Sequence, residues 1–219
     1  MKTLALIVRK PGVSRAAFRA HYEDVHAPLA LPLLKGLVRY VRHHVQSDLH
    51  GTAGFDVMTA FTYRDEAALR GVITHLASPS GDVLLRDELS FMHKPQNRFF
   101  AAREVAESGA RAASRSPPLA CIALVKRAPE RGEPAAFAAE FAKRALPELQ
   151  RAVRGLRWSL HHEALPVFGD PPFDVVTQLH AEAAGGLEEW ARTREREGAR
   201  VVVVSVTEAE TPIPLGGVG

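Results

Sequence analysis

Residues 18–28 read FRAHYEDVHAP, and residues 137–147 read FAAEFAKRALP. Both segments begin with phenylalanine, carry an aromatic residue at the fifth position and end with proline. The ninth position differs, because His26 of the first segment is replaced by Ala145. This comparison indicates a duplicated domain in which only one copy keeps a chemically competent side chain.

The repeat continues on both sides of these segments. The sequence LKGL at residues 34–37 corresponds to VRGL at 153–156, and FDV at 55–57 corresponds to FDV at 173–175 with the offset shortened by one residue. The chain has 219 residues, so each copy holds roughly 100 residues, which is enough to bury a core.

Apolar periodicity and turn residues predict the order strand, helix, strand, strand, helix, strand in the first copy. Ser14 should cap the first helix, and Pro28 should end it because proline cannot continue the helical hydrogen bonds. Residues 78–96 are polar and mixed, and we assign them to no element. The predicted elements are a strand at 3–8, a helix ending near 27–28, strands at 37–45 and 55–63, a helix at 66–76 and a strand at 98–105.

The second copy is predicted to repeat this order. Its elements are strands at 119–126, 156–163, 173–181 and 200–207, with helices at 134–151 and 187–196. The predicted domains are therefore residues 1–105 and 119–211, joined by a linker at 106–118 that is rich in Ala, Ser, Arg and Pro. Residues 212–219 are expected to form a loose tail.

The predicted fold class is α+β, with two tandem ferredoxin-like units. A β-α-β-β-α-β unit places both helices on one face of a four-stranded antiparallel sheet and leaves the other face in need of cover. The valines at 201–204 show no polar alternation, as expected of a strand that is buried on both faces. We therefore expect the two sheets to pack face to face as an intramolecular α/β barrel, which makes the chain a monomeric pseudo-dimer or a loose homodimer.

Composition excludes several classes of protein. The net charge is only +3, and acidic residues are interspersed among the basic ones, so nucleic acid is not an expected partner. The single cysteine, Cys121, excludes an internal disulfide and lies in an apolar strand, where a core role is expected. No apolar stretch is long enough to span a membrane or to serve as a signal peptide, so a cytoplasmic location is expected.

Phe18, Tyr22 and His26 are spaced by four residues and therefore share one helix face. The two aromatic residues indicate that this face turns toward the sheet, so they are candidate substrate-binding residues and His26 is a candidate general acid or base. The alternative is a core histidine that is hydrogen-bonded to backbone. Because the second copy has Ala145 at this position, the fold itself does not require the imidazole.

Tyr40 is the second candidate catalytic residue, and its counterpart in the second copy is Ser159. A phenol that faces His26 could donate a hydrogen bond to a carbonyl or enolate oxygen. Arg42 and His44 share a strand face with Tyr40 and are candidate substrate-binding residues, whereas His43 points to the opposite face. The alternative for Tyr40 is a strand aromatic with its hydroxyl at the surface.

The motif Phe18-x3-Tyr22-x3-His26-x-Pro28, followed by Gly36-Leu37, Tyr40, Asp87-Glu88 and Phe91, resembles the signature of the EthD-domain family. The resemblance covers residues 1 to about 105 and implies a fold of the dimeric α+β barrel superfamily. Relatives on that fold include cofactor-free monooxygenases, polyketide cyclases or dehydratases, and lactone isomerases. Their active cavity lies between the sheet and the helices of one half.

These observations favour a small-molecule enzyme that uses no cofactor and acts on an apolar carbonyl, phenolic or lactone compound. The competing hypotheses are a non-catalytic binding or accessory protein of a catabolic or biosynthetic pathway, and a duplicated barrel that binds no ligand. The histidines of the first half raise the question of metal or haem, but none has a recognised ligand spacing, so no metal is expected. The sequence leaves open whether the chain is catalytic and which reaction it performs.

Overall fold

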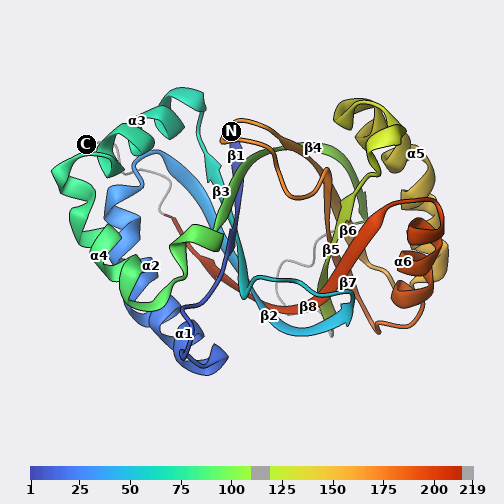
Figure 1. Cartoon of the computed structure of the whole chain (residues 1–219), viewed down its shortest axis with the longest axis horizontal. Helices are drawn as coiled ribbons and strands as arrows, with labels where there is room; N and C mark the ends of the chain where they lie inside the picture. The colour runs from blue at the N-terminus through green and yellow to red at the C-terminus, as the bar shows by residue number, and fades with distance from the viewer. Residues whose placement is uncertain (110–118, 214–219) are drawn as a thin grey trace. The chain divides into compact units, whose positions relative to one another are not determined.

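The computed structural model describes residues 1–109 and 119–213 (Figure 1). The predicted linker at 106–118 falls largely outside these ranges, although its first residues continue a strand as far as Gly109. The predicted tail from residue 212 is described only as far as residue 213.

The chain forms two compact units. The first unit contains Met1–His44, Gly54–Phe99 and the chain from Glu208 onward. The second unit contains Val45–Ala53 and Phe100–Thr207. Each unit therefore includes short strand segments that come from the other half of the sequence.

The sheet of the first unit contains β1 (Lys2–Ile7), β3 (Val57–Tyr63) and β2 (Leu37–His50), hydrogen-bonded in that order and antiparallel. β2 is longer than the predicted strand at 37–45, because it continues as far as His50. In the β2–β3 register Tyr40 lies opposite Phe61. The even-numbered positions of β2 therefore share the face that Tyr40 occupies, as the strand alternation predicts.

The first helical segment is longer than predicted. α1 (Arg15–His21) leads into a π-helical turn (Tyr22–His26), α2 (Ala27–Ala30) and a short 3-10 turn (Leu31–Leu33). The expectation that Pro28 ends the helix is wrong. The π-helical turn lets Ala27 donate to the Tyr22 carbonyl, and the proline then stands at the start of α2, where a missing N–H costs little.

The segment that we left unassigned contains a helix. α3 (Glu66–Leu76) has the predicted bounds, and it is followed by a 3-10 turn (Pro79–Gly81), α4 (Asp82–Phe91) and a second 3-10 turn (Lys94–Gln96). α4 buries Leu84 and Phe91 but exposes three other large apolar side chains, so its sequence has no clear apolar stripe. This helix supplies an acidic side chain to the candidate site.

The second unit contains two helices and five strands of an antiparallel sheet. The strands are hydrogen-bonded in the order β8-β5-β7-β6-β4, and β5 pairs with both β7 and β8. Five of its elements begin at the predicted residue, and β5 and α6 also end at the predicted residue. The elements are β4 (Arg98–Gly109), β5 (Leu119–Lys126), a 3-10 turn (Pro129–Arg131), α5 (Pro134–Ala152), β6 (Trp158–Leu165), β7 (Val175–Ala181), α6 (Leu187–Arg196) and β8 (Arg200–Thr211).

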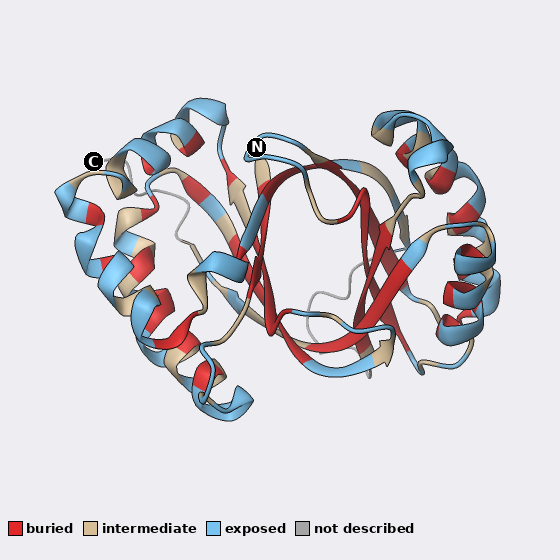
Figure 2. Ribbon diagram, viewed as in Figure 1, coloured by how far each residue is buried: buried red, intermediate tan, exposed pale blue. Residues whose placement is uncertain are grey.

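The core of each unit lies between its helices and its sheet, and Figure 2 shows buried turns alternating with exposed turns along the helices. In the second unit Phe141, Leu149 and Trp190 pack on apolar residues of β5, β7 and β8. The mixed α/β class with antiparallel sheets is confirmed, whereas the ferredoxin-like arrangement and the face-to-face packing of the sheets stay predictions. Within the described part of the chain, no helix has the length and apolar character needed to cross a membrane.

Candidate active site

The candidate site of the first unit is built on α1 and the π-helical turn. Ser14 caps α1 by accepting a hydrogen bond from the Ala17 amide, 3.1 Å away. Phe18, Tyr22 and His26 are all buried, and the His26 residue is 4% exposed. The predicted inward orientation of this face is confirmed. π-helical turns occur often at functional sites, which is consistent with the position of His26 in this one.

His26 is held by a carboxylate from α4. Its Nδ1 donates to Oδ2 of Asp87 at 2.8 Å, and the other carboxylate oxygen of Asp87 lies 2.7 Å from Nε2 of His21. Because a carboxylate only accepts, the neutral His26 ring carries its proton on Nδ1 and keeps a lone pair on Nε2. Asp87 on α4 therefore fixes the tautomer of His26, while His21 on α1 contacts the other oxygen of the same carboxylate.

Burial lowers the pKa of His26 below its usual value, since the charged imidazole loses hydration. The hydrogen bond to Asp87 and the negative charges of Asp87 and Glu88 oppose this shift without cancelling it. His26 is therefore neutral at physiological pH, which is the form that can accept a proton. Asp87 is the group that would stabilise the imidazolium formed by that transfer.

Aromatic rings enclose the imidazole. The ring of Tyr22 lies edge-on to His26 at a centroid distance of 4.9 Å, and Phe91 lies 5.3 Å away. Phe18 in turn packs against Phe91 at 5.3 Å. The rings that pack against His26 are thus aromatic, and Asp87 is its hydrogen-bond partner.

The structure brings the Tyr22 ring to His26, and Tyr40 on β2 interacts with Tyr22. Tyr22 shares a hydrogen bond with the Thr59 hydroxyl at 2.9 Å, and burial raises its pKa to about 12. Tyr40 is fully buried and stacks on Phe61 at 5.1 Å. Its hydroxyl makes no well-formed hydrogen bond within the described residues, and burial raises its pKa well above the usual value. Tyr40 therefore remains protonated and able to donate.

Arg42 and His44, the other two candidate residues, are both bound by Glu23. The Glu23 carboxylate accepts from Arg42 Nε at 3.0 Å and Nη2 at 2.6 Å, and from His44 Nε2 at 2.6 Å. The Arg42 guanidinium also lies over the Tyr40 ring, 4.4 Å from its centroid. His43 points to the other face of β2, as predicted, and its Nδ1 lies 3.2 Å from Glu208.

Burial alone would raise the pKa of Glu23, but hydrogen bonds from His44 and Arg42 and the charge of Arg42 lower it to about 2. Our sequence reasoning missed the roles of Glu23, His21 and Asp87. Asp87 was visible only as part of the family signature, and nothing in the spacing of Glu23 indicated its two partners. All three depend on how the helices lie on the sheet.

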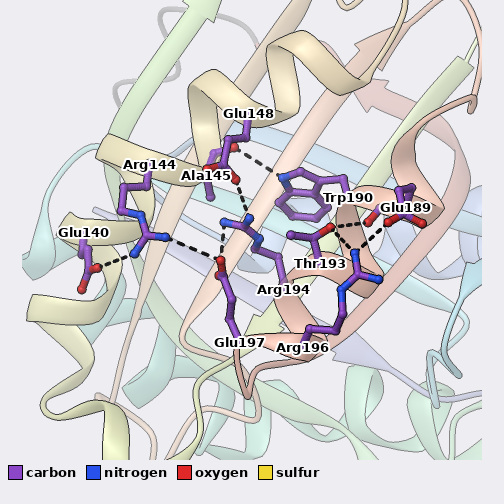
Figure 3. A network of polar contacts seen from close by, with 10 residues as sticks. All are labelled: Glu140, Arg144, Ala145, Glu148, Glu189, Trp190, Thr193, Arg194, Arg196 and Glu197. Atoms are coloured by element: carbon purple, nitrogen blue, oxygen red, sulfur yellow. Dashed lines mark hydrogen bonds and ion pairs between the residues drawn. The ribbon is translucent and has the colours of Figure 1, made fainter.

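The corresponding region of the second unit has a different chemistry. Ala145 is buried, and its carbonyl accepts a hydrogen bond from the Trp190 indole at 3.4 Å (Figure 3). Trp190 also packs edge-on against Phe141, the counterpart of Tyr22. His161, the counterpart of Arg42, is bonded to Thr177 at 2.8 Å, and burial lowers its pKa to about 3. An indole therefore fills the core of the second unit near the position that corresponds to His26.

Charged side chains cover this core at the surface of α5 and α6. In Figure 3 Arg194 lies between Glu148 and Glu197, and Arg144 lies between Glu140 and Glu197. The network contains three arginine–glutamate contacts at 3.0–3.5 Å and a closer one between Arg194 and Glu148. Each arginine lies between two carboxylates, so these side chains form a surface ion-pair network.

Two other predictions concern Cys121 and metals. Cys121 is buried, and burial raises the pKa of its thiol to about 12, which supports a core role. Within residues 1–109 and 119–213, no group of three or more His, Cys, Asp or Glu side chains has the arrangement of a metal site.

The family model of the EthD domain matches residues 10–95. The resemblance inferred from the motif of the first half is therefore confirmed, and the match ends before the second half begins. The matched segment includes His26, Tyr40 and Asp87. No curated protein matches the chain.

Solved structures that are similar to this chain include the following three proteins. An anthrone oxidase-like protein is 9% identical with a TM-score of 0.65, and the match covers 99% of this chain and 95% of that chain. A provisionally named monooxygenase from Lactobacillus acidophilus is 11% identical with a TM-score of 0.52, covering 96% of this chain and 95% of that one. An EthD family protein from Bacillus halodurans is 26% identical with a TM-score of 0.33, covering 43% of this chain and 89% of that one. The first two likenesses show the fold.

Proposed function

We propose, on the premise that residues 10–95 form an EthD domain, that this domain is the catalytic half of a small-molecule enzyme and that His26 transfers a proton in its reaction. The observation that carries the proposal is the bond between His26 Nδ1 and Asp87 in an otherwise apolar site. A neutral, tautomer-fixed imidazole is suited to general base catalysis at neutral pH. The second unit, which has Ala145 at this position, would serve a structural role.

In the proposed reaction Nε2 of His26 removes a proton from a carbon next to a carbonyl group or from a phenolic oxygen. Asp87 then stabilises the imidazolium through the existing hydrogen bond, and the negative charge that forms on the substrate oxygen accepts a hydrogen bond from a tyrosine. We assign this role to Tyr22, whose ring contacts His26, with Tyr40 as the neighbour of Tyr22. His26 finally returns its proton at a different atom.

This chemistry suits isomerisation, dehydration or cyclisation of an apolar carbonyl, phenolic or lactone compound, without a cofactor. The names of the similar structures, an anthrone oxidase-like protein and a monooxygenase, favour a related possibility in which the deprotonated substrate reacts with oxygen. Polyketide or aromatic metabolism is the setting that we propose. Phe18 and Tyr22 would then contact the substrate body, whereas Arg42 and His44 would act through Glu23.

The alternative function is a non-catalytic binding or accessory protein that uses the same site. The apolar packing of Tyr22 and Phe91 against His26 suits this alternative as well as it suits an enzyme, because an apolar site can bind a ligand with or without turnover. The two functions differ in whether a product forms.

The decisive test compares the wild type with His26→Ala and Asp87→Asn on a panel of aromatic ketones, phenols and lactones, with products followed by mass spectrometry. His26→Ala should reduce turnover by about 10²–10⁴-fold, the usual contribution of a general base. Asp87→Asn removes a negative charge that raises the pKa of His26, so it should lower kcat and shift the acid limb of the pH profile to lower pH. Asp24 is an exposed carboxylate of the π-helical turn that carries His26, so Asp24→Asn is the matched control for the loss of a negative charge.

Unchanged turnover in His26→Ala would refute the role of this residue. Binding without product in both the wild type and His26→Ala would instead support the accessory function. Circular dichroism should show an intact fold in His26→Ala, because Ala145 occupies the same position in the second unit.

We also propose that the two units form an intramolecular pseudo-dimer of two ferredoxin-like repeats in the cytoplasm. A chain that supplies both sheets needs no second copy, so light scattering should give the mass of one chain or of a weakly associating dimer. An obligate dimer that exchanges halves between chains would contradict this arrangement.

A further inference from the structure

A groove on the first unit lies away from His26. It has a volume of about 340 Å³ and opens where the turn before β2 meets α3. Its apolar side is formed by Leu33, Ala68 and Val72. A cavity of about 150 Å³ holds a benzene ring, so this groove has room for an aromatic ring with a polar substituent.

The groove carries an excess of positive charge. Lys35 and Arg64 line it, and no carboxylate does. Lys35 forms no ion pair within residues 1–109 and 119–213, and the one carboxylate near Arg64 is that of its neighbour Asp65, 3.5 Å away and half exposed. Nη2 of Arg64 lies 4.0 Å from the position that a Cβ on Gly36 would take, so the guanidinium reaches across the turn beside Lys35.

The second unit provides an internal comparison. Arg64 donates its amide hydrogen to the Gly36 carbonyl at 2.9 Å, and Glu182 donates its own to the Gly155 carbonyl at 3.2 Å, so the two turns correspond in structure. At the position of Arg64 the second unit therefore has a glutamate. The Glu182 side chain covers Gly155, since a Cβ built there would lie 2.6 Å from it, and it pairs with Arg157 at 2.7 Å.

Gly71 on α3 gives the groove its width. A Cβ at Gly71 would meet no atom within 4 Å, so this face of the helix is open. Glycine lowers helix stability relative to most other residues, and nothing in the local packing of Gly71 requires it. The open space that it leaves is part of the groove.

We propose that this groove binds a small molecule that has one carboxylate and an apolar body. Lys35 and Arg64 would hold the carboxylate, with Arg64 able to donate two parallel hydrogen bonds, and Leu33 and Val72 would contact the apolar part. This site does not depend on the proposed function of His26, and the turn in the second unit lacks it because Glu182 supplies the opposite charge.

The test uses benzoate as the probe and benzamide as its neutral analogue, with binding followed by amide chemical shifts of Gly36, Gly71 and His75. Benzoate should bind in the millimolar range and benzamide more weakly. The double variant Lys35→Ala/Arg64→Ala should lose about tenfold in affinity, because exposed ion pairs contribute only modestly to binding. Arg154→Ala, at the counterpart of Lys35, should leave benzoate binding unchanged.

Gly71→Leu provides an independent variant, because its side chain would fill the groove while leucine favours the helix. It should abolish benzoate binding and keep or raise the melting temperature. Equal binding of benzoate and benzamide, unchanged affinity in the double variant, or full binding to a folded Gly71→Leu protein would each overturn the proposal. Absence of benzoate shifts in the wild type would overturn it as well.

Discussion

Glu23→Gln tests whether the carboxylate beneath the candidate site holds the first unit together. Glu23 accepts from the buried Arg42 guanidinium and from His44, and its pKa falls from 4.5 to about 2. At 1.36 kcal/mol per pKa unit, this shift corresponds to about 3 kcal/mol of stability. Breaking a buried ion pair costs a similar amount, about 3–5 kcal/mol, because the remaining charge is left without a partner. We therefore expect Glu23→Gln to lower the free energy of unfolding by about 3 kcal/mol at neutral pH.

The pH dependence distinguishes the carboxylate charge from simple packing. The folded-state pKa of Glu23 is lower than the unfolded-state value, so its contribution is complete above about pH 4.5 and is lost as the pH falls toward about 2. Urea unfolding followed by far-ultraviolet circular dichroism should show the wild type and Glu23→Gln converging across that window. Glu66→Gln, which removes an exposed partner of Arg70 on α3, should cost no more than about 0.5 kcal/mol.

The reasoning fails if Glu23→Gln costs as little as Glu66→Gln. It also fails if the difference between wild type and Glu23→Gln is the same at neutral and at acid pH, because the loss would then not depend on the charge of the carboxylate.

Two further predictions concern the second unit. His161 is buried and neutral, and its pKa is lowered to about 3, so the wild-type free energy of unfolding should fall as the pH is lowered from about 6.5 to about 3. His161→Gln should remove up to about 1.4 kcal/mol per pH unit of that slope. Equal slopes for the two proteins in urea titrations would contradict the assignment. Gly186 has a φ of 88°, and a Cβ at this position would lie 1.9 Å from the Ala152 carbonyl oxygen. Gly12 has a similar φ, but a Cβ there would meet no atom within 4 Å, so Gly12→Ala should cost about 1–2 kcal/mol. Gly186→Ala should therefore lower thermal stability far more than Gly12→Ala. Equal melting temperatures would show that the backbone moves to relieve the contact.

Much of the fold was predictable because strong apolar patterns determine most of its elements. The helix at 66–76 and the helix at 187–196 have the predicted bounds, and the strand at 119–126 is a continuous apolar run. The alternation along β2 correctly separated Tyr40 from His43. In these segments local pattern and tertiary packing favour the same structure.

The remainder depends on tertiary contacts. α4 buries few of its apolar side chains, so its periodicity is weak, and missing this helix hid Asp87, the partner of His26. Pro28 looked like a helix end because sequence rules assume regular α-helical hydrogen bonding, which the π-helical turn replaces. The pairing of Glu23 with Arg42 joins residues that are 19 positions apart on different elements, and neither spacing nor charge pattern indicates it.

The position of β8 has a consequence for biosynthesis. Its valine-rich part pairs with β5 inside the second unit, while the chain from Glu208 onward belongs to the first, where Glu210 bonds Arg39 and Thr211 bonds Arg42. Both units therefore stay incomplete until β8 has left the ribosome. During translation the sheet of each unit presents an unpaired edge, and the valine run itself has the apolar, β-branched character of aggregating segments. The yield of soluble protein should therefore respond to the rate at which the codons of β8 are translated and to chaperones that shield these edges.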